Sequence, residues 1–389
     1  MPSLVPLLSL AGFAIVAVMR ITDPLLPVIA RDFDVTVGQA GVVVTAFAVG
    51  YGLFQLAFGP LGDKLGKLRV IAVTLGGAAV FVAGCAFAPS LHALSVLRFL
   101  TGMACAAAIP LTIAWIGDNV PEALRQTTIA RYSTGIIFGQ MMGTGFGGML
   151  ADWLGWRGVF GVYTAVLVPV AVLIGRQARF ESPPAQAVSL ALGDQLDRYR
   201  VVTKSPAAVA VLAAAFTEGF CLFGGMAYLG ALLHERHGLS FTLIGLLLVG
   251  YGVGGLIYSL SSAWLLRRYS RRRMIQLGGG LIATGFFVFS DLPHWSVAAA
   301  LTMLIGLGFY LMHNTLQTLA LELIPGARGT SFGLFAFTLF AGQGLGVWCL
   351  GRLIDARGFT LPFVMMGVCT GALGLLLAGS RALRKQLDA

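Results

Sequence analysis

Charged side chains are scarce in this sequence. Asp, Glu, Lys and Arg make up 11% of its 389 residues and hydrophobic residues make up 57%, whereas soluble domains carry about 25% charged residues. Such a chain has too few polar side chains to cover a water-soluble surface. The composition therefore excludes an ordinary soluble globular protein and indicates one that lies in a membrane.

Paired cysteines and cofactor-binding motifs are also lacking. The five cysteines lie in apolar stretches without a paired spacing, so we expect packing residues rather than a disulfide framework or a metal site. Gly66 and Lys67 lack the earlier glycine and the following Ser or Thr of a phosphate-binding loop. We therefore expect no cofactor, no metal and no ATP use, and we do not expect an enzyme.

Long apolar runs are what the sequence has instead. A helix needs about 20 apolar residues to cross about 30 Å of hydrocarbon, and about twelve such runs recur between short charged or Pro/Gly-rich breaks. The first run has no positively charged start and is too long for a signal peptide, so we expect it to remain as a helix. The fold class is predicted as an all-α polytopic membrane protein with spans near residues 4–30, 38–60, 70–88, 91–117, 127–151, 158–176, 206–233, 240–266, 274–290, 295–320, 330–351 and 359–380.

Lys and Arg are distributed unevenly between the two sides of these spans. With the N-terminus inside, nineteen of the 26 lie in cytoplasmic breaks and five in outer breaks, and Arg20 and Arg98 lie within spans. The positive-inside rule then predicts that both termini lie in the cytoplasm, and we expect the location to be a bacterial-type inner membrane. Contact with anionic lipid explains the net charge of +10, so no nucleic-acid partner is expected.

The sequence contains an internal repeat. A shift of 204 residues places Lys67 on Arg271. A shift of 203 places Asp152 on Asp355. The pattern predicts two six-helix halves, residues 1–176 and 206–389, joined by a cytoplasmic linker at 177–205. The middle of the linker forms either a short amphipathic helix on the membrane surface or a plain connection.

Repeated six-span halves are typical of the major facilitator superfamily, and one motif carries the resemblance. "GPLGDKLGKLR" (59–69) resembles the superfamily's signature between spans two and three, with matches at Gly59, Asp63, Gly66, Lys67 and Arg69. Its glycines allow a tight turn, and Asp63 is expected to bind a basic residue or a helix N-terminus of the opposing half. The second half has Arg267 at the equivalent position, so this gating contact is expected on one side only.

Two further motifs narrow the resemblance. "LSVLRFLTGMACA" (94–106) resembles the span-four signature of proton-coupled members. "GIIFGQMMGTGFGG" (135–148) resembles the span-five signature of drug/proton antiporters, with Thr144 where those proteins have proline, and its matching glycines are Gly135, Gly139, Gly143, Gly147 and Gly148. On residue types alone such a stripe also fits close helix packing. The full spacing implies an exporter of the drug/proton antiporter family.

Arg20, Asp23 and Arg98 are ionisable residues within predicted spans one and four. A charge at the bilayer centre costs roughly 3 kcal/mol on insertion scales, so such residues face a partner or a water-filled cavity. Asp23 and Arg98 lie at similar depth and Arg20 is one turn from Asp23, so we expect Asp23 to be bracketed by both arginines. The cluster is either a structural or substrate-orienting network or, in the case of Asp23, a direct proton carrier.

Glu218 lies near the middle of span seven with no basic residue within two turns of its own helix. An unpartnered carboxylate in a desolvated cavity can exchange a proton near neutral pH, so Glu218 is the favoured proton carrier. The alternative is a carboxylate satisfied by hydroxyls or amides of other helices. In span ten, His313 is a further candidate for proton coupling, with Asn314 and Gln317 as polar neighbours.

The predicted cavity helices carry aromatic residues and glutamines that suit a large apolar pocket with polar tips. Aromatic stripes of this kind serve helix packing in most cases. The substrate-lining candidates are Arg20, Tyr51, Gln55, Arg98, Gln140, Phe216, Phe220, Tyr251, Tyr310, Asn314, Gln317, Phe340 and Gln343. Such a pocket favours amphipathic aromatic compounds.

These features favour a proton-coupled secondary transporter that exports hydrophobic or amphipathic small molecules. Its expected partners are a small-molecule substrate, protons and membrane lipid, and a monomer is expected. Two alternatives remain open. In one, Arg20 and Arg98 bind an anion, which predicts a transporter of organic acids or sugar-like metabolites, including import by symport. In the other, the cavity opens sideways and the protein translocates lipid.

Overall fold

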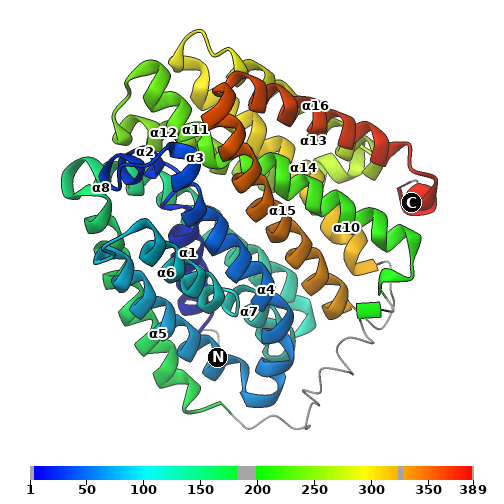
Figure 1. The fold of residues 1–389 in the computed structure, drawn as a ribbon. Helices are drawn as coiled ribbons and strands as arrows, with labels where there is room; N and C mark the ends of the chain where they lie inside the picture. The colour runs from blue at the N-terminus through cyan, green and yellow to red at the C-terminus, as the bar shows by residue number, and fades with distance from the viewer. Residues whose placement is uncertain (1–3, 182–198, 201, 323–327, 388–389) are drawn as a thin grey trace.

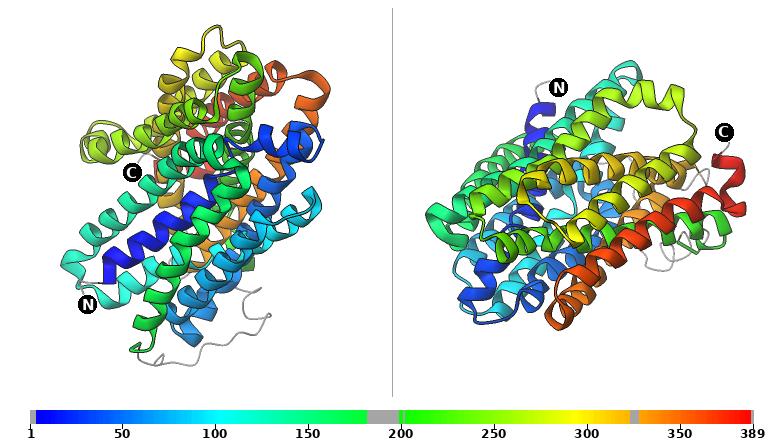
Figure 2. Two further views of the ribbon diagram at one scale, coloured as in Figure 1. Left: turned by 90° about the vertical axis from the view of Figure 1, so that its left-hand side faces the viewer. Right: turned by 90° about the horizontal axis from the view of Figure 1, so that it is seen from above.

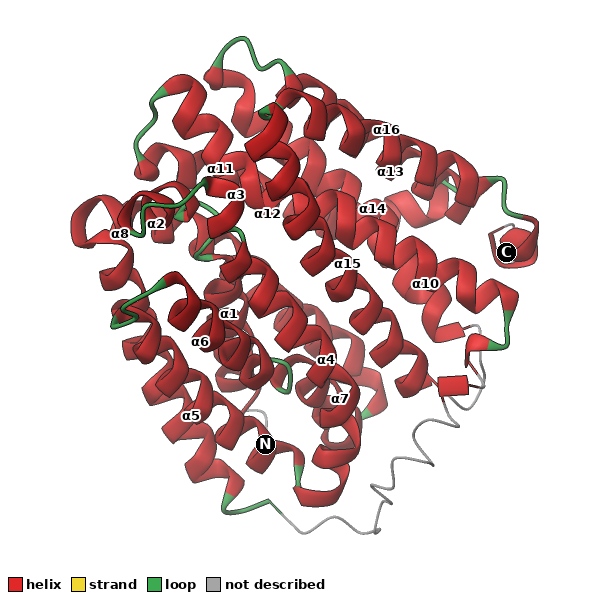
Figure 3. Ribbon diagram, viewed as in Figure 1, coloured by secondary structure: helices red, strands yellow, loops and turns green. Residues whose placement is uncertain are grey.

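The computed structural model describes residues 4–181, 199–200, 202–322 and 328–387, and every regular element within these ranges is a helix (Figure 1). Short loops join the helices at both ends of the bundle (Figure 3). The all-α prediction is confirmed. The predicted amphipathic segment in the middle of the linker lies outside the described residues.

The described residues contain the expected number of membrane spans. Ten helical segments within them are long and apolar enough to cross a membrane. One of these, α8 (Glu122–Ala178), is two spans joined at Gly155, whose φ of 67° and ψ of 170° interrupt the helix. The shorter α1 (Leu4–Arg20) supplies a further apolar helix. The twelve spans predicted from hydropathy are therefore present.

The remaining elements follow in chain order. The first half continues with α2 (Leu26–Asp32), α3 (Val37–Ala40), α4 (Val42–Leu65), α5 (Lys67–Ala86), α6 (Leu91–Cys105) and α7 (Ala108–Asn119) before α8. The second half contains α10 (Pro206–Glu218), a π-helical turn (Gly219–Phe223), α11 (Gly224–His237), α12 (Phe241–Arg268), α13 (Arg271–Ser290), α14 (Ala298–Glu322), α15 (Arg328–Arg357), α16 (Thr360–Ala378) and α17 (Arg384–Leu387).

Span one is broken where a continuous helix was predicted. Proline has no N–H, and its ring clashes with the carbonyl four residues earlier. Pro24 therefore ends the helix at Arg20, whose carbonyl accepts a hydrogen bond from the amide of Asp23 at 3.1 Å instead. The chain turns through residues 21–25 and resumes as α2. The break places the charged pair at the end of a helix rather than along one.

The glycine motif of span five is a packing surface. Any Cβ at Gly135, Gly139 or Gly143 would collide with the backbone of α1, and Gly147 continues the same stripe against Ile21. The first arm of α8 therefore lies directly along α1 (Figure 2). A Cβ at Gly148 would instead meet the backbone at the start of α12, in the other half.

Equivalent ion pairs occur in the two halves. Lys67 at the start of α5 binds Asp118 of α7 at 2.8 Å, and Arg271 at the start of α13 binds Glu322 of α14 at 2.6 Å. Both residues of the first pair are displaced by 204 positions from those of the second. The halves thus share the architecture that the repeat predicts, although their boundaries at 176 and 206 remain a prediction. The end that carries Gly155 and α3 is called outer below, after the orientation that Lys and Arg predict.

Candidate functional site

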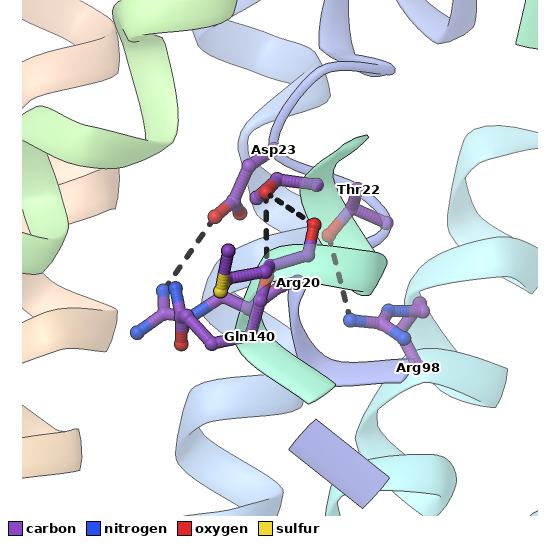
Figure 4. A network of polar contacts seen from close by, with 7 residues as sticks. Arg20, Thr22, Asp23, Arg98 and Gln140 are labelled. Atoms are coloured by element: carbon purple, nitrogen blue, oxygen red, sulfur yellow. Dashed lines mark hydrogen bonds and ion pairs between the residues drawn. The ribbon is translucent and has the colours of Figure 1, made fainter. Parts of the chain in front are cut away.

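Arg20 lies at the break of span one and contacts both halves of the molecule. Its side chain is 4% exposed, and its Nε donates to Oε1 of Gln140 in α8 at 3.0 Å. One terminal nitrogen lies 3.6 Å from Oδ2 of Asp23, as expected for neighbours one turn apart (Figure 4). The guanidinium also lies 4.3 Å from the ring centre of Phe223, in the π-helical turn of the second half. Arg20 is therefore positioned where the two halves meet.

Arg98 does not bracket Asp23 in the way the sequence suggested. The side chain is fully buried and donates to the carbonyl of Val18 at 3.1 Å. It also donates to the hydroxyl of Thr22 at 3.5 Å (Figure 4). Its guanidinium lies 4.3 Å from the ring centre of Phe47 in α4. Because Val18 and Thr22 belong to the broken end of span one, Arg98 holds span four against that break. Its charge reaches Asp23 through space rather than through an ion pair.

Glu218 has a basic partner from another helix. Nδ1 of His313 in α14 lies 2.8 Å from Oε2 of Glu218, and the Glu218 side chain is completely buried. The expectation of an unpartnered carboxylate is therefore wrong, because span ten approaches span seven at this level. The His313 ring stacks on Phe309 with a centroid distance of 4.5 Å. The π-helical turn begins directly after Glu218, and such turns occur frequently at functional sites.

Tyr251 connects the two charged clusters. It lies in α12, is 2% exposed, and packs beside Phe309, whose ring contacts both Phe223, which lies under Arg20, and His313, which binds Glu218. Its ring lies 5.7 Å from that of Phe309, centre to centre. The candidates from spans one, seven, eight and ten are thus brought into one buried region between the halves.

The other predicted lining residues lie on α4, α10, α14, α15 and the π-helical turn. Tyr51 of α4 and Phe340 of α15 meet across the two halves with ring centres 4.5 Å apart. Gln55 and Gln343 are buried, and Phe216 stacks on Phe220 at 6.4 Å. The remaining candidates are half-buried and lie on α14: Tyr310, Asn314 and Gln317.

Two ring contacts were missed in the sequence. Phe223 lies over Arg20, and Phe309 stacks on His313. Phe309 precedes His313 by four residues, which places both on one helix face and is a signal that the sequence contains. Phe223 carries no such signal, because its contact depends on how the second half docks against the first.

The turn motif at 59–69 is held within its own half. Asp63 binds Lys67 at 2.9 Å instead of the opposing half, which corrects the predicted partner. Gly66 has a φ of 96°, a conformation that favours glycine, and a Cβ there would also meet the carboxylate of Glu181. Glu181 accepts from the amides of Leu68 and Arg69 at 3.1 and 3.2 Å. Gly59 faces open space.

A charged cluster at the outer end also joins distant segments. Asp32, at the end of α2, binds Arg157 and accepts from the indole of Trp156 at 3.1 Å. The hydrogen bond from Arg157 holds the pKa of Asp32 below its ordinary value. Arg157 also lies 4.2 Å from the centre of the Trp156 ring and donates to the carbonyl of Ala88 at 3.3 Å. This cluster fixes the loop after span one against the turn between spans five and six.

Comparison with known proteins identifies the family. Residues 8–347 match the family described as Major Facilitator Superfamily. The chain is 28% identical over 347 residues to the "Uncharacterized MFS-type transporter YceJ" of Bacillus subtilis, covering 86% of this chain and 85% of that protein. It is also 28% identical over 409 residues to a "Gallate transporter" of Pseudomonas putida, covering 92% and 87%.

A solved structure agrees with these relatives. The bacterial homologue of the human lysosomal transporter Spinster, in an inward-facing and occupied conformation, superimposes with a TM-score of 0.79 at 17% identity, over 99% of this chain and 97% of that one. This likeness establishes the fold. Because the family match extends over most of the residues, from span one to span eleven, the chain belongs to the major facilitator superfamily and is a multi-pass membrane transporter rather than an enzyme.

Proposed function

We propose that this protein is a proton-coupled symporter of small aromatic organic anions. The observation that carries the proposal is the charge balance of the buried region between the halves. Arg20 and Arg98 contribute two positive charges and Asp23 one negative charge. The Glu218–His313 pair is neutral when it shares one proton and negative when that proton leaves. The region therefore has a net charge of plus one with the proton bound and zero without it.

This balance couples the anion to the proton. An anion binds more tightly to a region of positive net charge than to a neutral one, especially where burial strengthens electrostatic interactions. Linkage is reciprocal, so a bound anion also strengthens proton binding at the pair. Proton and anion then bind and cross together. Competition between them, as antiport requires, is favoured only for a cationic substrate.

The aromatic side chains and one relative support the substrate class. Phe223, Phe309 and Tyr251 surround the charged groups and offer flat apolar surfaces to a ring. The relative from Pseudomonas putida is named a gallate transporter, and gallate is an aromatic carboxylate. The glycines of span five, which motivated the drug/proton antiporter assignment, are accounted for by close packing on α1 and α12.

A second candidate is export of amphipathic compounds, and a groove between α4 and α15 favours it. The groove has a volume of about 340 Å³ and is lined by Thr45, Val49, Gly52, Leu53, Phe337, Ala341, Gly344, Leu345 and Trp348. Four of its apolar side chains are more than 40% exposed, on a surface that faces lipid: Val49, Leu53, Leu345 and Trp348. A compound dissolved in the bilayer would reach the halves' interface by this route.

For either candidate, we propose a monomer in a bacterial-type inner membrane with both termini in the cytoplasm. The excess of Lys and Arg in the breaks at one end of the bundle supports this orientation. Protons and membrane lipid are its further partners in this proposal.

Uptake by proteoliposomes tests the function. Purified protein is reconstituted, and uptake of labelled gallate is measured with the outside one pH unit more acidic than the inside. We expect this gradient to drive gallate accumulation, Arg20→Gln to abolish it, and Arg20→Lys to retain part of it because the charge is kept. Ethidium serves as the cationic comparison compound.

The outcomes separate the two candidates. Gallate uptake that depends on the pH gradient and on the charge at position 20 supports the anion symporter. Ethidium extrusion without gallate transport would replace it with the exporter. Gallate uptake that is indifferent to the pH gradient would remove the proton-coupling part of the proposal.

A further inference from the structure

Three buried oxygen atoms around the charged region lack a hydrogen-bond partner among the described residues. They are Oδ1 of Asp23, Oε1 of Glu218 and the hydroxyl of Tyr251, and Nε of Arg98 in the same region also lacks a partner. These side chains belong to residues that are 3%, 0% and 2% exposed. Each carboxylate has its other oxygen engaged, by Arg20 and by His313 respectively. Buried polar atoms are satisfied in the great majority of cases, so a group of three in one region calls for an explanation.

The chemistry of these atoms defines what satisfies them. An ionised carboxylate oxygen only accepts hydrogen bonds, and a tyrosine hydroxyl both donates and accepts. The missing partner must therefore supply donors to Asp23 and Glu218. An ammonium group would also donate, but the positive charges of Arg20 and Arg98 oppose it. Neutral hydroxyl groups meet the need without that repulsion.

We infer that the substrate carries hydroxyl groups on its ring, donated to Asp23 and Glu218 beside Tyr251, with its carboxylate at Arg20. This inference rests on the proposed function and specifies the substrate further. Tyr251 is a specificity-determining residue in this arrangement, because its hydroxyl is unpartnered and its ring packs on Phe309, which contacts both Phe223 and His313. The transported class is then hydroxylated aromatic acids rather than aromatic acids in general.

A graded ligand series tests the inference. Affinities of purified protein for benzoate, 4-hydroxybenzoate, gallate and glucuronate are measured by calorimetry. We expect affinity to rise from benzoate to gallate by at least roughly tenfold, since hydrogen bonds to charged groups are among the stronger ones. Tyr251→Phe should reduce the gallate-to-benzoate affinity ratio. Tyr258→Phe, on the same helix and also buried, is the matched control and should preserve the ratio.

Each outcome has a distinct meaning. Equal binding of benzoate and gallate overturns the inference but leaves the anion site standing. Failure of all four ligands to bind the folded wild-type protein instead overturns the proposed function. Glucuronate binding as tightly as gallate would remove the requirement for an aromatic ring.

A second inference comes from two equivalent carboxylates at the outer end. Asp152 of α8 accepts from the amides of Phe241 and Thr242 at 3.2 and 2.7 Å and from the Thr242 hydroxyl at 2.6 Å. Asp355 of α15 accepts from the amide of Gly38 at 3.0 Å and from the Thr36 hydroxyl at 2.6 Å. Each carboxylate belongs to one half and binds the start of a helix in the other.

The geometry points to a reciprocal latch, Asp152 on α12 and Asp355 on α3, that holds the outer end closed. A carboxylate satisfies the free amides at a helix start and is favoured there by the helix dipole. Separating the halves at the outer end breaks both sets of bonds at once. At the cytoplasmic end, the ion pairs of Lys67 and Arg271 stay within their own halves and do not oppose separation.

Hydrogen exchange distinguishes a latch from two independent helix caps. We expect Asp152→Asn to accelerate amide exchange roughly fivefold at the start of α12 and also, remotely, at the start of α3, because opening is shared. Asp355→Asn should do the same in reverse. Asp34→Asn, in the outer loop, is the matched control and should accelerate neither. Acceleration confined to the helix next to each substitution would reduce both residues to local caps and overturn the latch.

Discussion

Replacing Glu218 by glutamine tests whether this residue carries the coupled proton. Glutamine keeps the size of the side chain and can still hydrogen bond to His313, which lies 2.8 Å away in the wild type. The substitution removes only the ability to gain and lose a proton. Because the side chain is completely buried, bulk water cannot compensate for the change in its charge.

The charge balance predicts what this change does to binding. With a neutral residue at 218 and neutral His313, the two arginines and Asp23 leave a net charge of plus one. This equals the net charge of the wild type with its proton bound. The Glu218→Gln variant should therefore bind the anion as tightly as the wild type does under acidic conditions. It should also keep that affinity at alkaline pH, where binding to the wild type weakens.

Transport distinguishes the Glu218→Gln variant from the wild type more clearly than binding does. One proton moved across a gradient of one pH unit supplies about 1.4 kcal/mol, which sustains roughly tenfold accumulation of a symported anion. The wild type should approach this ratio when the membrane potential is clamped at zero. The variant has no proton to couple, so its accumulation ratio should fall to about one, and downhill exchange should continue.

Reconstituted vesicles provide both readouts on one preparation. Accumulation of labelled gallate under a pH gradient measures coupling, and exchange of internal for external gallate at equal pH measures the translocation that remains. Glu235→Gln is the matched control, since Glu235 is exposed in α11 of the same span. Tenfold accumulation by the Glu218→Gln variant would refute the reasoning and move attention to Asp23 as carrier. Loss of exchange together with a lowered melting temperature would mean that the pair serves folding instead.

Three other changes probe the remaining polar contacts. Arg98→Ala leaves the Val18 carbonyl and the Thr22 hydroxyl without their donor, so its thermal stability in detergent should fall by the equivalent of about 2–4 kcal/mol. Asp63→Asn should leave folding intact and slow the interconversion of inward and outward states, because the Lys67 contact at the gating turn is weakened. Single-turnover transport measures this rate, and an unchanged rate would contradict a gating role. The lowered pKa of Asp32 means that its bond to Arg157 stabilises the native state above the ordinary Asp range and is lost as the pH falls below about 4. Asp32→Asn should remove that part of the acid-induced fall in melting temperature, and an identical pH profile would argue against it.

Much of the architecture was predictable because it depends on local properties of the chain. The number of spans follows from the length and hydropathy of each run, and these do not depend on which helices touch. The repeat was also readable, since the pairs Lys67–Asp118 and Arg271–Glu322 keep their spacing of 204 positions. The charged residues of the site were found for the same reason. A charge within an apolar run is visible without any tertiary information.

What the charged residues contact was decided by packing. Whether Glu218 meets His313 depends on the rotation of two helices about their axes, and apolar sequences leave that rotation nearly free in a membrane. The same holds for Arg98, which contacts the broken end of span one instead of Asp23. The sequence by itself determined the class of protein, its spans and its ionisable residues. Only the tertiary structure decided the partners of Arg98 and Glu218, because those partners lie on other helices.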